Sequence, residues 1–455
     1  MTHSFARMRR GPVPRPGVTA LTLGLAVVLA SPAVTAAPTP FADYLATWNI
    51  ARADRASLEP PGAWSPEKQA TALRVLGRLA RVPANLAMAW NAEAIDLRAV
   101  PVGERLQDRL VRVTGTATFV AVLPLPEDAA ALAGRKAWEQ VRIVADDGLA
   151  VDVLADHVPQ AWPRDTPIHE PTVVIGLPLA DGPGPTAPPG GAAPADVLLA
   201  AARVGWFPPT PLGGAGMDYG LFDTVVDGQK LVVGDTEAFY AVLAAAGRID
   251  PAAVAGPPAD IVPLINPQGG WFTRHRGEPV TVEGVARRAT RIEIDDPFRR
   301  QQVGVDHYWE LYVFVPTPLL EVHDRLQEDY PVVCCVRTLP DGMPTGPQIG
   351  ERVRVTGFAL KRYRYPLPDV KISSSRGESE RQGLRQDTCL LVGGAAVWRP
   401  QATPDRAIDT LGWVFTGLAA LIGAALAVAA WAFARDARRR ERQARRELPE
   451  RIEVP

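Results

Sequence analysis

The composition of this 455-residue chain indicates a folded protein: 47% of its residues are hydrophobic and 22% charged, and its 45 prolines and 39 glycines argue against one long helical bundle. The net charge of −1 conceals an uneven distribution, because residues 37–433 contain 37 basic and 45 acidic residues, a net charge of −8. An acidic body argues against non-specific binding to nucleic acid or anionic lipid, and the length suggests about two or three domains.

The N-terminus, residues 1–36, is predicted to be a secretory signal peptide. A basic region ends at Arg15 and is followed by the uncharged stretch Val18–Ala30. The small residues at Val34–Ala36 fit the usual cleavage pattern. An uncleaved membrane anchor is the alternative.

Residues 37–209 are predicted to form a helix followed by a five-stranded β unit. The segment Ser65–Arg81 has the apolar spacing of an amphipathic helix, with Ser65 as its N-cap. The Asp-Gly at Asp147–Gly148 is a hairpin signal between two strands. A loop rich in proline and glycine, Asp181–Pro194, is interpreted as a solvated insertion. Five strand candidates follow the helix: 110–123, 139–145, 149–155, 171–179 and 196–206.

Residues 210–234 are predicted to be a linker. Residues 235–400 are predicted to form a second helix followed by a second five-stranded β unit. Asp235–Arg248 is a second helix pattern, with Asp235 as its N-cap. A long polar stretch, Pro366–Thr388, again precedes the last strand. The strand candidates of this unit are 279–294, 308–315, 330–338, 351–361 and 388–398.

Sequence matches between the two units predict a duplication. The strand ends Val197–Pro208 and Cys389–Pro400 resemble each other, each closing with an aromatic residue shortly before a proline. A unit of about 150–170 residues would account for these matches, and generic similarity between strands is the alternative. A Val-x-Val-x-Gly motif occurs three times with one degenerate copy: Val111–Gly115, Val280–Gly284, Val353–Gly357 and Thr172–Gly176.

Five strands with a glycine in the first and fourth, and a last strand that carries Leu-Leu, resemble the oligonucleotide/oligosaccharide-binding (OB) barrel. The resemblance covers residues 110–206 and 279–398, and it implies a ligand face to which the loop between strands four and five contributes. The helix precedes the strands here, whereas OB barrels usually place one between strands three and four. The expected fold class is mainly β with α: two duplicated helix-plus-five-stranded OB-like units and one transmembrane helix. Small β-sandwiches are the alternative.

Residues 411–433 are predicted to be the transmembrane helix. They carry no charge and, at about 1.5 Å per residue, are long enough to cross a hydrocarbon core of about 30 Å. Trp413 and Trp431 lie near its ends, where indoles favour the membrane interface. Residues 434–455 contain eight arginines, which predicts a cytoplasmic basic tail after a single span of the cell membrane. Residues 401–410 would be a juxtamembrane linker. A buried core helix is the alternative.

The three cysteines predict one disulfide inside the second unit. Cys334 and Cys335 are neighbours on a predicted strand, so their side chains point to opposite faces. Cys389 can therefore pair easily with only one of them, and an exported body permits that bond. The sequence leaves open which of the two it is.

The densest polar cluster lies within Glu293–Glu310. It contains five side chains that would bind a divalent cation or act as acid and base: Asp295, Asp296, Asp306, His307 and Glu310. A charged loop neutralised by its own arginines is the alternative.

A second candidate site alternates cations with aromatic residues at Lys361, Arg362, Tyr363, Arg364 and Tyr365. On a strand the two tyrosines would share one face and the two arginines the other. Such a surface would hold an anionic glycan or an acidic partner protein, or nucleic acid less readily, while a charge-protected edge strand is the alternative. Three arginines of the first strand would extend it: Arg287, Arg288 and Arg291.

No catalytic signature such as Gly-x-Ser-x-Gly or His-Glu-x-x-His occurs, and no cofactor is expected, so the sequence does not predict an enzyme. The expected function is that of a membrane-anchored extracytoplasmic binding or scaffold protein. It would act as an accessory subunit that binds a protein or an envelope polymer through OB-like barrels. The alternatives are a metal-dependent hydrolase of envelope material and, less favoured, a nucleic-acid-binding protein.

Overall fold

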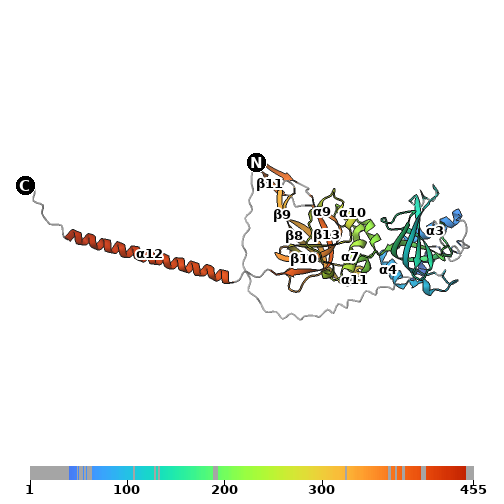
Figure 1. Cartoon of the computed structure of the whole chain (residues 1–455), viewed down its shortest axis with the longest axis horizontal. Coiled ribbons are helices and arrows are strands. Elements are labelled where there is room, and N and C mark those ends of the chain that lie inside the picture. Colours follow the sequence, from blue (N-terminus) through green and yellow to red (C-terminus); the bar gives the residue numbers. More distant parts are fainter. Residues whose placement is uncertain are drawn as a thin grey trace, which may run out of the picture. The chain divides into compact units, whose positions relative to one another are not determined.

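A computed structural model describes most of the chain between Pro40 and Arg446 as a mixed α/β protein with a closed five-stranded barrel, a second sheet and one apolar C-terminal helix (Figure 1). The predicted signal peptide lies outside the described residues. These are 40–48, 50, 55, 58, 64–105, 108–127, 130–131, 134–187, 193–322, 325–366, 370–374, 377–381, 385–400 and 406–446.

Among the described residues, three helices precede the first sheet: α1 (Phe41–Thr47), α3 (Pro66–Leu79) and α4 (Ala84–Glu93). Helix α3 begins where the sequence predicts, because the Ser65 hydroxyl accepts a hydrogen bond from the Lys68 backbone N–H at 3.3 Å. Its buried residues, which include Val75 and Leu76, pack with apolar side chains of the sheet. The helix lies against strands β4 and β6.

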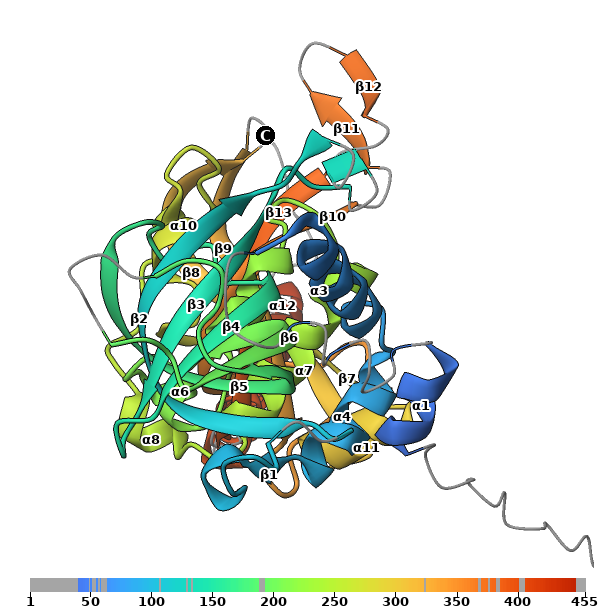
Figure 2. The same cartoon turned by 90° about the vertical axis from the view of Figure 1, so that its right-hand side faces the viewer.

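The first sheet contains the five predicted strands and one short addition (Figure 2). Its order is β1-β2-β3-β4-β6-β5, and β2 also pairs with β5, so that β2 to β6 form a continuous ring of pairings. Strands β4 and β6 run parallel. The bounds are β1 (Ile95–Asp96), followed by the 3-10 helix η1 (Leu97–Ala99), β2 (Val111–Pro124), β3 (Ala137–Ala145), β4 (Ala150–His157), β5 (Pro167–Asp181) and β6 (Val197–Trp206).

The second barrel is closed in the order β10-β13-β9-β8-β7, with β10 pairing back to β7. A closed barrel is consistent with an OB-like unit and excludes a small sandwich here. Its strands are β7 (Pro279–Glu293), β8 (His307–Val322), β9 (Arg325–Thr338), β10 (Glu351–Pro366) and β13 (Arg385–Arg399), and the predicted polar stretch contains the hairpin β11 (Val370–Ser374) and β12 (Gly377–Arg381). Short helices surround it: α7 (Thr236–Ala246), α8 (Pro251–Val254), α9 (Val262–Ile265), α10 (Trp271–His275) and α11 (Pro297–Val303).

The two sheets share one connectivity, in which the first strand lies between the second and the fourth and the third runs parallel to the fifth. Their registers also correspond, since Val111 pairs with Gly176 and Val280 pairs with Gly357. The first strands have a bulge at the same place, between Ala117 and Phe119 in β2 and between Ala286 and Arg288 in β7. Residues of β2 thus correspond to residues of β7 that lie 169 positions later.

Asp235 occupies the predicted N-cap position of α7, but its side chain does not cap the helix. Its carboxylate makes no cap hydrogen bond to α7. It accepts one from the Val232 backbone N–H at 3.0 Å and pairs with Lys361 Nζ at 2.6 Å. Both charged side chains are fully buried, so the pair ties the start of α7 to strand β10.

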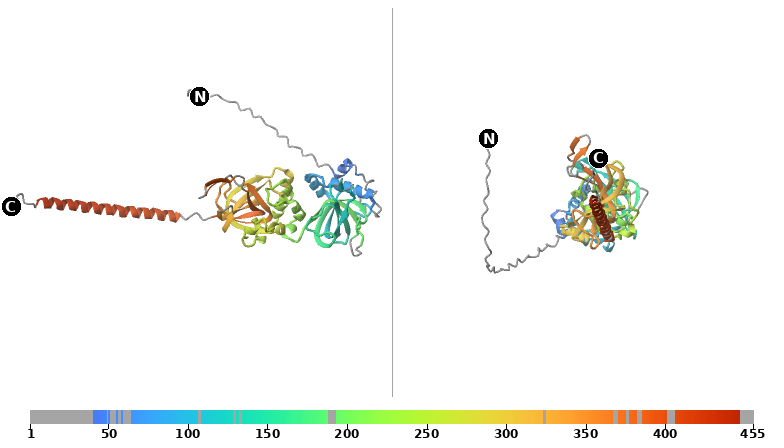
Figure 3. Two further views of the ribbon diagram at one scale, coloured as in Figure 1. Left: turned by 90° about the horizontal axis from the view of Figure 1, so that it is seen from above. Right: turned by 90° about the vertical axis from the view of Figure 1, so that its left-hand side faces the viewer.

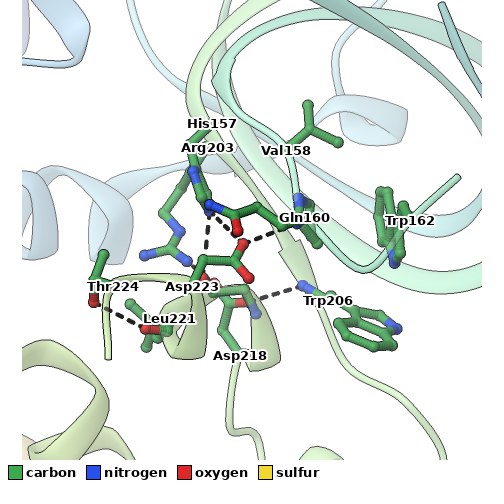
Figure 4. Close-up of polar contacts among 12 residues, drawn as sticks. His157, Val158, Gln160, Trp162, Arg203, Trp206, Asp218, Leu221, Asp223 and Thr224 are labelled. Atoms are coloured by element: carbon green, nitrogen blue, oxygen red, sulfur yellow. Dashed lines mark hydrogen bonds and ion pairs between the residues drawn. The ribbon is translucent and has the colours of Figure 1, made fainter. Parts of the chain in front are cut away.

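The predicted linker, residues 210–234, is structured and bonded on both sides. It contains α6 (Pro211–Gly214), η2 (Tyr219–Thr224) and the start of η3 (Val233–Asp235). The Tyr219 hydroxyl donates to the Gly277 carbonyl at 3.5 Å, just before β7. Two aspartates contact strands of the first sheet: Asp223 lies 3.0 Å from His157 Nε2, and Asp218 lies 2.8 Å from Arg203 Nη2 (Figure 4).

Helix α12 (Arg406–Arg446) is one continuous helix, drawn in red in Figure 3. Its segment Phe415–Arg440 reaches a mean hydropathy of 2.1, and none of that stretch is buried against the chain. By length and composition it can cross a membrane, and its exposure is unlike that of a buried core helix. The helix extends beyond the predicted span of 411–433 at both ends.

Candidate functional site

Four half-buried tyrosines gather on the outer face of the second barrel. Tyr308 and Tyr312 come from β8, where the alternate residues Leu311 and Val313 point into the core. Tyr363 and Tyr365 come from β10, with ring centroids 6.2 Å apart. The ring of Tyr365 also lies 6.3 Å from that of Tyr312, which joins the two strands' tyrosines into one cluster. The expectation that Tyr363 and Tyr365 share a face is confirmed.

Glu310 lies between Tyr308 and Tyr312 along β8, and its side chain is 23% exposed. The nearest cation is Arg288, whose Nη2 lies 3.9 Å from a Glu310 oxygen. Burial raises the pKa of Glu310, and Arg288 lowers it by less. Burial likewise raises the pKa of Tyr363 to about 12, so its phenol is a neutral hydrogen-bond donor at neutral pH.

Among the three predicted arginines of the first strand, Arg288 alone reaches this cluster. Its guanidinium lies 5.2 Å from the ring centroid of Tyr312, a cation–π geometry. Arg287 instead covers the ring of Phe314 at 3.9 Å. Arg291 pairs with Glu293 at 2.7 Å. We call Arg288, Tyr308, Glu310, Tyr312, Tyr363 and Tyr365 the tyrosine face.

The cations of the predicted Arg/Tyr strand do not form a free basic surface. Lys361 is fully buried with Asp235 and therefore cannot contact a ligand. Arg364 makes two hydrogen bonds to Asp387, at 2.7 and 2.8 Å, and Arg362 lies 3.2 Å from the same carboxylate. Because one acid of β13 serves both guanidiniums, this strand is poorly suited to bind a chain of phosphates.

The five predicted metal ligands do not converge. Asp296 accepts from the Phe298 backbone N–H at 2.9 Å and thereby caps α11. Asp306 lies 2.5 Å from His307 Nδ1, and that hydrogen bond lowers the pKa of Asp306. Glu310 belongs to the tyrosine face, and the Asp295 carbonyl accepts from Arg300 at 3.2 Å. The described part of the chain holds no group of three or more His, Cys, Asp or Glu side chains that could bind a metal ion.

All three cysteines are buried free thiols, so the predicted disulfide is not formed in this structure. Cys334 and Cys389 share the interior core of the second barrel, whereas Cys335 packs on the side of α7. The expected opposite orientation of the neighbouring thiols is therefore confirmed. Burial raises the pKa of the Cys389 thiol to about 12 and that of the other two well above the usual value.

The corresponding face of the first sheet is covered by its own chain. Gln140 and Arg142 on β3 pair with Ala121 and Phe119, which correspond to the β7 partners of Glu310 and Tyr312. Three described residues of the loop Asp181–Pro194 contact this face, so at these points the loop is not the solvated insertion that the sequence suggests. Its contacts are Thr186 O with Gln140 Nε2 at 2.7 Å, Ala193 O with Arg142 Nη1 at 2.8 Å, and Gly184 N with Asp152 Oδ2 at 2.8 Å.

Sequence reasoning missed Tyr308 and Tyr312. The signal that finds them is the alternation of Tyr308, Glu310 and Tyr312 along one strand, which places all three on one face. Neither a protein-family model nor a curated protein matches the chain. The function must therefore be inferred from the geometry of the site.

Proposed function

We propose that this chain is a membrane-anchored, extracytoplasmic binding protein and that the tyrosine face of its second barrel binds a partner protein. The main support for this proposal is the cluster itself, in which four tyrosines, one carboxylate and one arginine lie together on strands of a rigid barrel. Tyrosine and arginine contribute most to binding energy in protein interfaces, because they bury large areas at a small entropic cost.

The chemistry of the face favours a protein over the other partners. Four phenols offer hydrogen bonds beside apolar ring surface, while Arg288 and Glu310 supply one charge of each sign. An anionic polymer would meet the buried carboxylate of Glu310, and the arginines of β10 are already paired with Asp387. A mixed surface of this kind fits the centre of a protein interface with a polar rim.

We further propose that the two units are duplicated OB-like barrels with divided roles. The shared registers and bulges support the duplication, and so does a repeated side-chain contact at the fifth strand. The indole N–H of Trp206 donates to Glu170 at 2.7 Å, and that of Trp398 donates to Glu351 at the same distance. We assign the first unit, whose outer face is contacted by its own loop, a structural role, and the second unit the binding of the partner protein.

The C-terminal helix is the proposed anchor. Its apolar segment is exposed, and arginines follow it in the chain, which favours a cytoplasmic tail under the positive-inside rule. The barrels then lie on the outer side of the cell membrane. A protease added to cells whose outer face has been made accessible is expected to digest the barrels and to spare an epitope placed at the C-terminus.

Chemical crosslinking in native membranes, followed by affinity purification of the full chain, tests the binding proposal. The double variant Tyr312→Ala/Tyr365→Ala is compared with Val397→Ala, which removes an exposed apolar side chain elsewhere on the barrel. We expect at least about tenfold lower recovery of one specific protein with the double variant, because these tyrosines would be central to the interface. Equal recovery from both variants would refute the proposal.

A further inference from the structure

A separate cavity of about 650 Å³ lies beside helix α3 of the first unit. Its apolar lining includes Leu73 and Leu76 of the helix and Trp138 of β3. Leu76 and Trp138 are almost fully buried. Gly77 also lines it, and a Cβ built there would meet no atom within 4 Å. The volume lies within the range of small-molecule sites, about 300–1,000 Å³.

The rim of this cavity is strongly basic. Arg74 and Arg78 line it from one face of α3, four residues apart, and Arg81 lines it from just beyond the end of the helix. Arg135 adds a fourth guanidinium, which pairs with Asp156, the one acid among the described lining residues. Arg74, Arg78 and Arg81 are exposed and make no ion pair within the described part of the chain. This excess of positive charge occurs in a body that is otherwise acidic.

Such a combination selects a particular ligand chemistry. Guanidiniums bind phosphate and carboxylate through paired hydrogen bonds, and the Trp138 and leucine surfaces favour an apolar chain. We infer that the cavity binds an anionic amphiphile, with its alkyl chain against Leu73, Leu76 and Trp138 and its head group at Arg74, Arg78 and Arg81. This site lies on the first unit and is independent of the tyrosine face.

Photolabelling of the full chain in phosphatidylcholine nanodiscs tests this inference. The reagent is an alkyl phosphate with a diazirine in its chain, and a matched reagent ends in a hydroxyl group. Two variants act on different parts of the site: Gly77→Phe fills the cavity without changing charge, and Arg74→Gln/Arg78→Gln removes charge at exposed positions. Arg352→Gln, an exposed arginine of β10, is the control.

We expect the phosphate reagent to label peptides that contain α3 or Trp138. Labelling should fall at least about fivefold in both cavity variants, remain unchanged in the control, and be displaced by dodecyl phosphate. Labelling confined to α12, equal labelling by the hydroxyl reagent, or labelling that both variants leave unchanged would overturn the inference. Displacement by inorganic phosphate at the same concentration as dodecyl phosphate would also overturn it, since the cavity would then bind anions without a chain.

Discussion

At the residue scale, the most informative position is Glu310, a carboxylate set among tyrosine rings. Its side chain is mostly buried, yet its one cation, Arg288, stands 3.9 Å away and is half exposed. Burial therefore dominates and raises the pKa of Glu310. The buried carboxylate of Glu310 lowers the stability of the free protein. A partner that donates a hydrogen bond to this carboxylate would therefore be bound more tightly.

The raised pKa predicts a pH-dependent effect of Glu310→Gln on stability. Since the folded-state pKa lies above the unfolded value of 4.5, the folded protein is favoured at low pH and loses stability as the pH rises through the folded pKa. Glutamine does not ionise, so the variant should unfold about 1–3 °C higher at pH 7. Thermal unfolding in nanodiscs from pH 4 to pH 8 measures this.

The advantage of Glu310→Gln should vanish towards pH 4, where the wild-type side chain is protonated in both states. Glu293→Gln, which removes an exposed carboxylate of the neighbouring strand, controls for general charge effects. A difference between Glu310→Gln and wild type that does not change with pH would contradict this account of the site.

The buried thiols predict a simple labelling pattern. Because burial raises the pKa of all three, the thiolate that reacts with iodoacetamide is scarce in the folded protein. We expect no labelling of the folded chain and three labels after unfolding without a reductant, as measured by mass spectrometry. A single label after unfolding would instead reveal the disulfide that the sequence suggests, with Cys334 as the partner of Cys389 within the shared core.

At the scale of the elements, the barrels depend on glycines where neighbouring strands approach closely. A Cβ on Gly115 would lie 2.4 Å from the Val144 carbonyl oxygen, and one on Gly284 would lie 2.1 Å from that of Phe314. These are corresponding positions in β2 and β7. In the first strand of each unit, the Val-x-Val-x-Gly motif thus ends in glycine because the second strand leaves no room for a side chain.

Alanine at these positions should therefore destabilise either barrel. We expect Gly115→Ala and Gly284→Ala each to cost about 2–4 kcal/mol, since backbone atoms must move to admit the methyl group. Gly350→Ala is the matched control, because a Cβ there meets nothing within 4 Å. Denaturant unfolding in nanodiscs compares the three, and a Gly284→Ala variant as stable as Gly350→Ala would show that the strands do not pack as described.

Local patterns were sufficient to predict the long strands and two of the helices. The ten long strands and the helices α3 and α7 all lie where alternation and capping place them, because those signals depend on nearby residues. Tertiary partners could not be predicted in this way. Lys361 pairs with Asp235, 126 positions away, and Asp387 pairs with two arginines of another strand. Because of these long-range ion pairs, the cations of strand β10 stabilise the fold and do not form a basic ligand-binding surface.

At the scale of the whole molecule, described loop residues of the first unit bond to its outer face, whereas the second unit presents the tyrosine face. This difference between two units of the same topology is the central argument that the second one binds. The segment between the two units is bonded to both of them.

The most direct test is site-specific photocrosslinking in native membranes. A photoreactive phenylalanine analogue replaces Tyr312 in one variant of the full chain and Val397 in another, and products are identified by mass spectrometry. We predict one discrete protein adduct from position 312 that is lost when Tyr365→Ala is added, and none from position 397. No adduct from position 312, or the same adduct from both positions, would contradict the claim that the tyrosine face binds a partner.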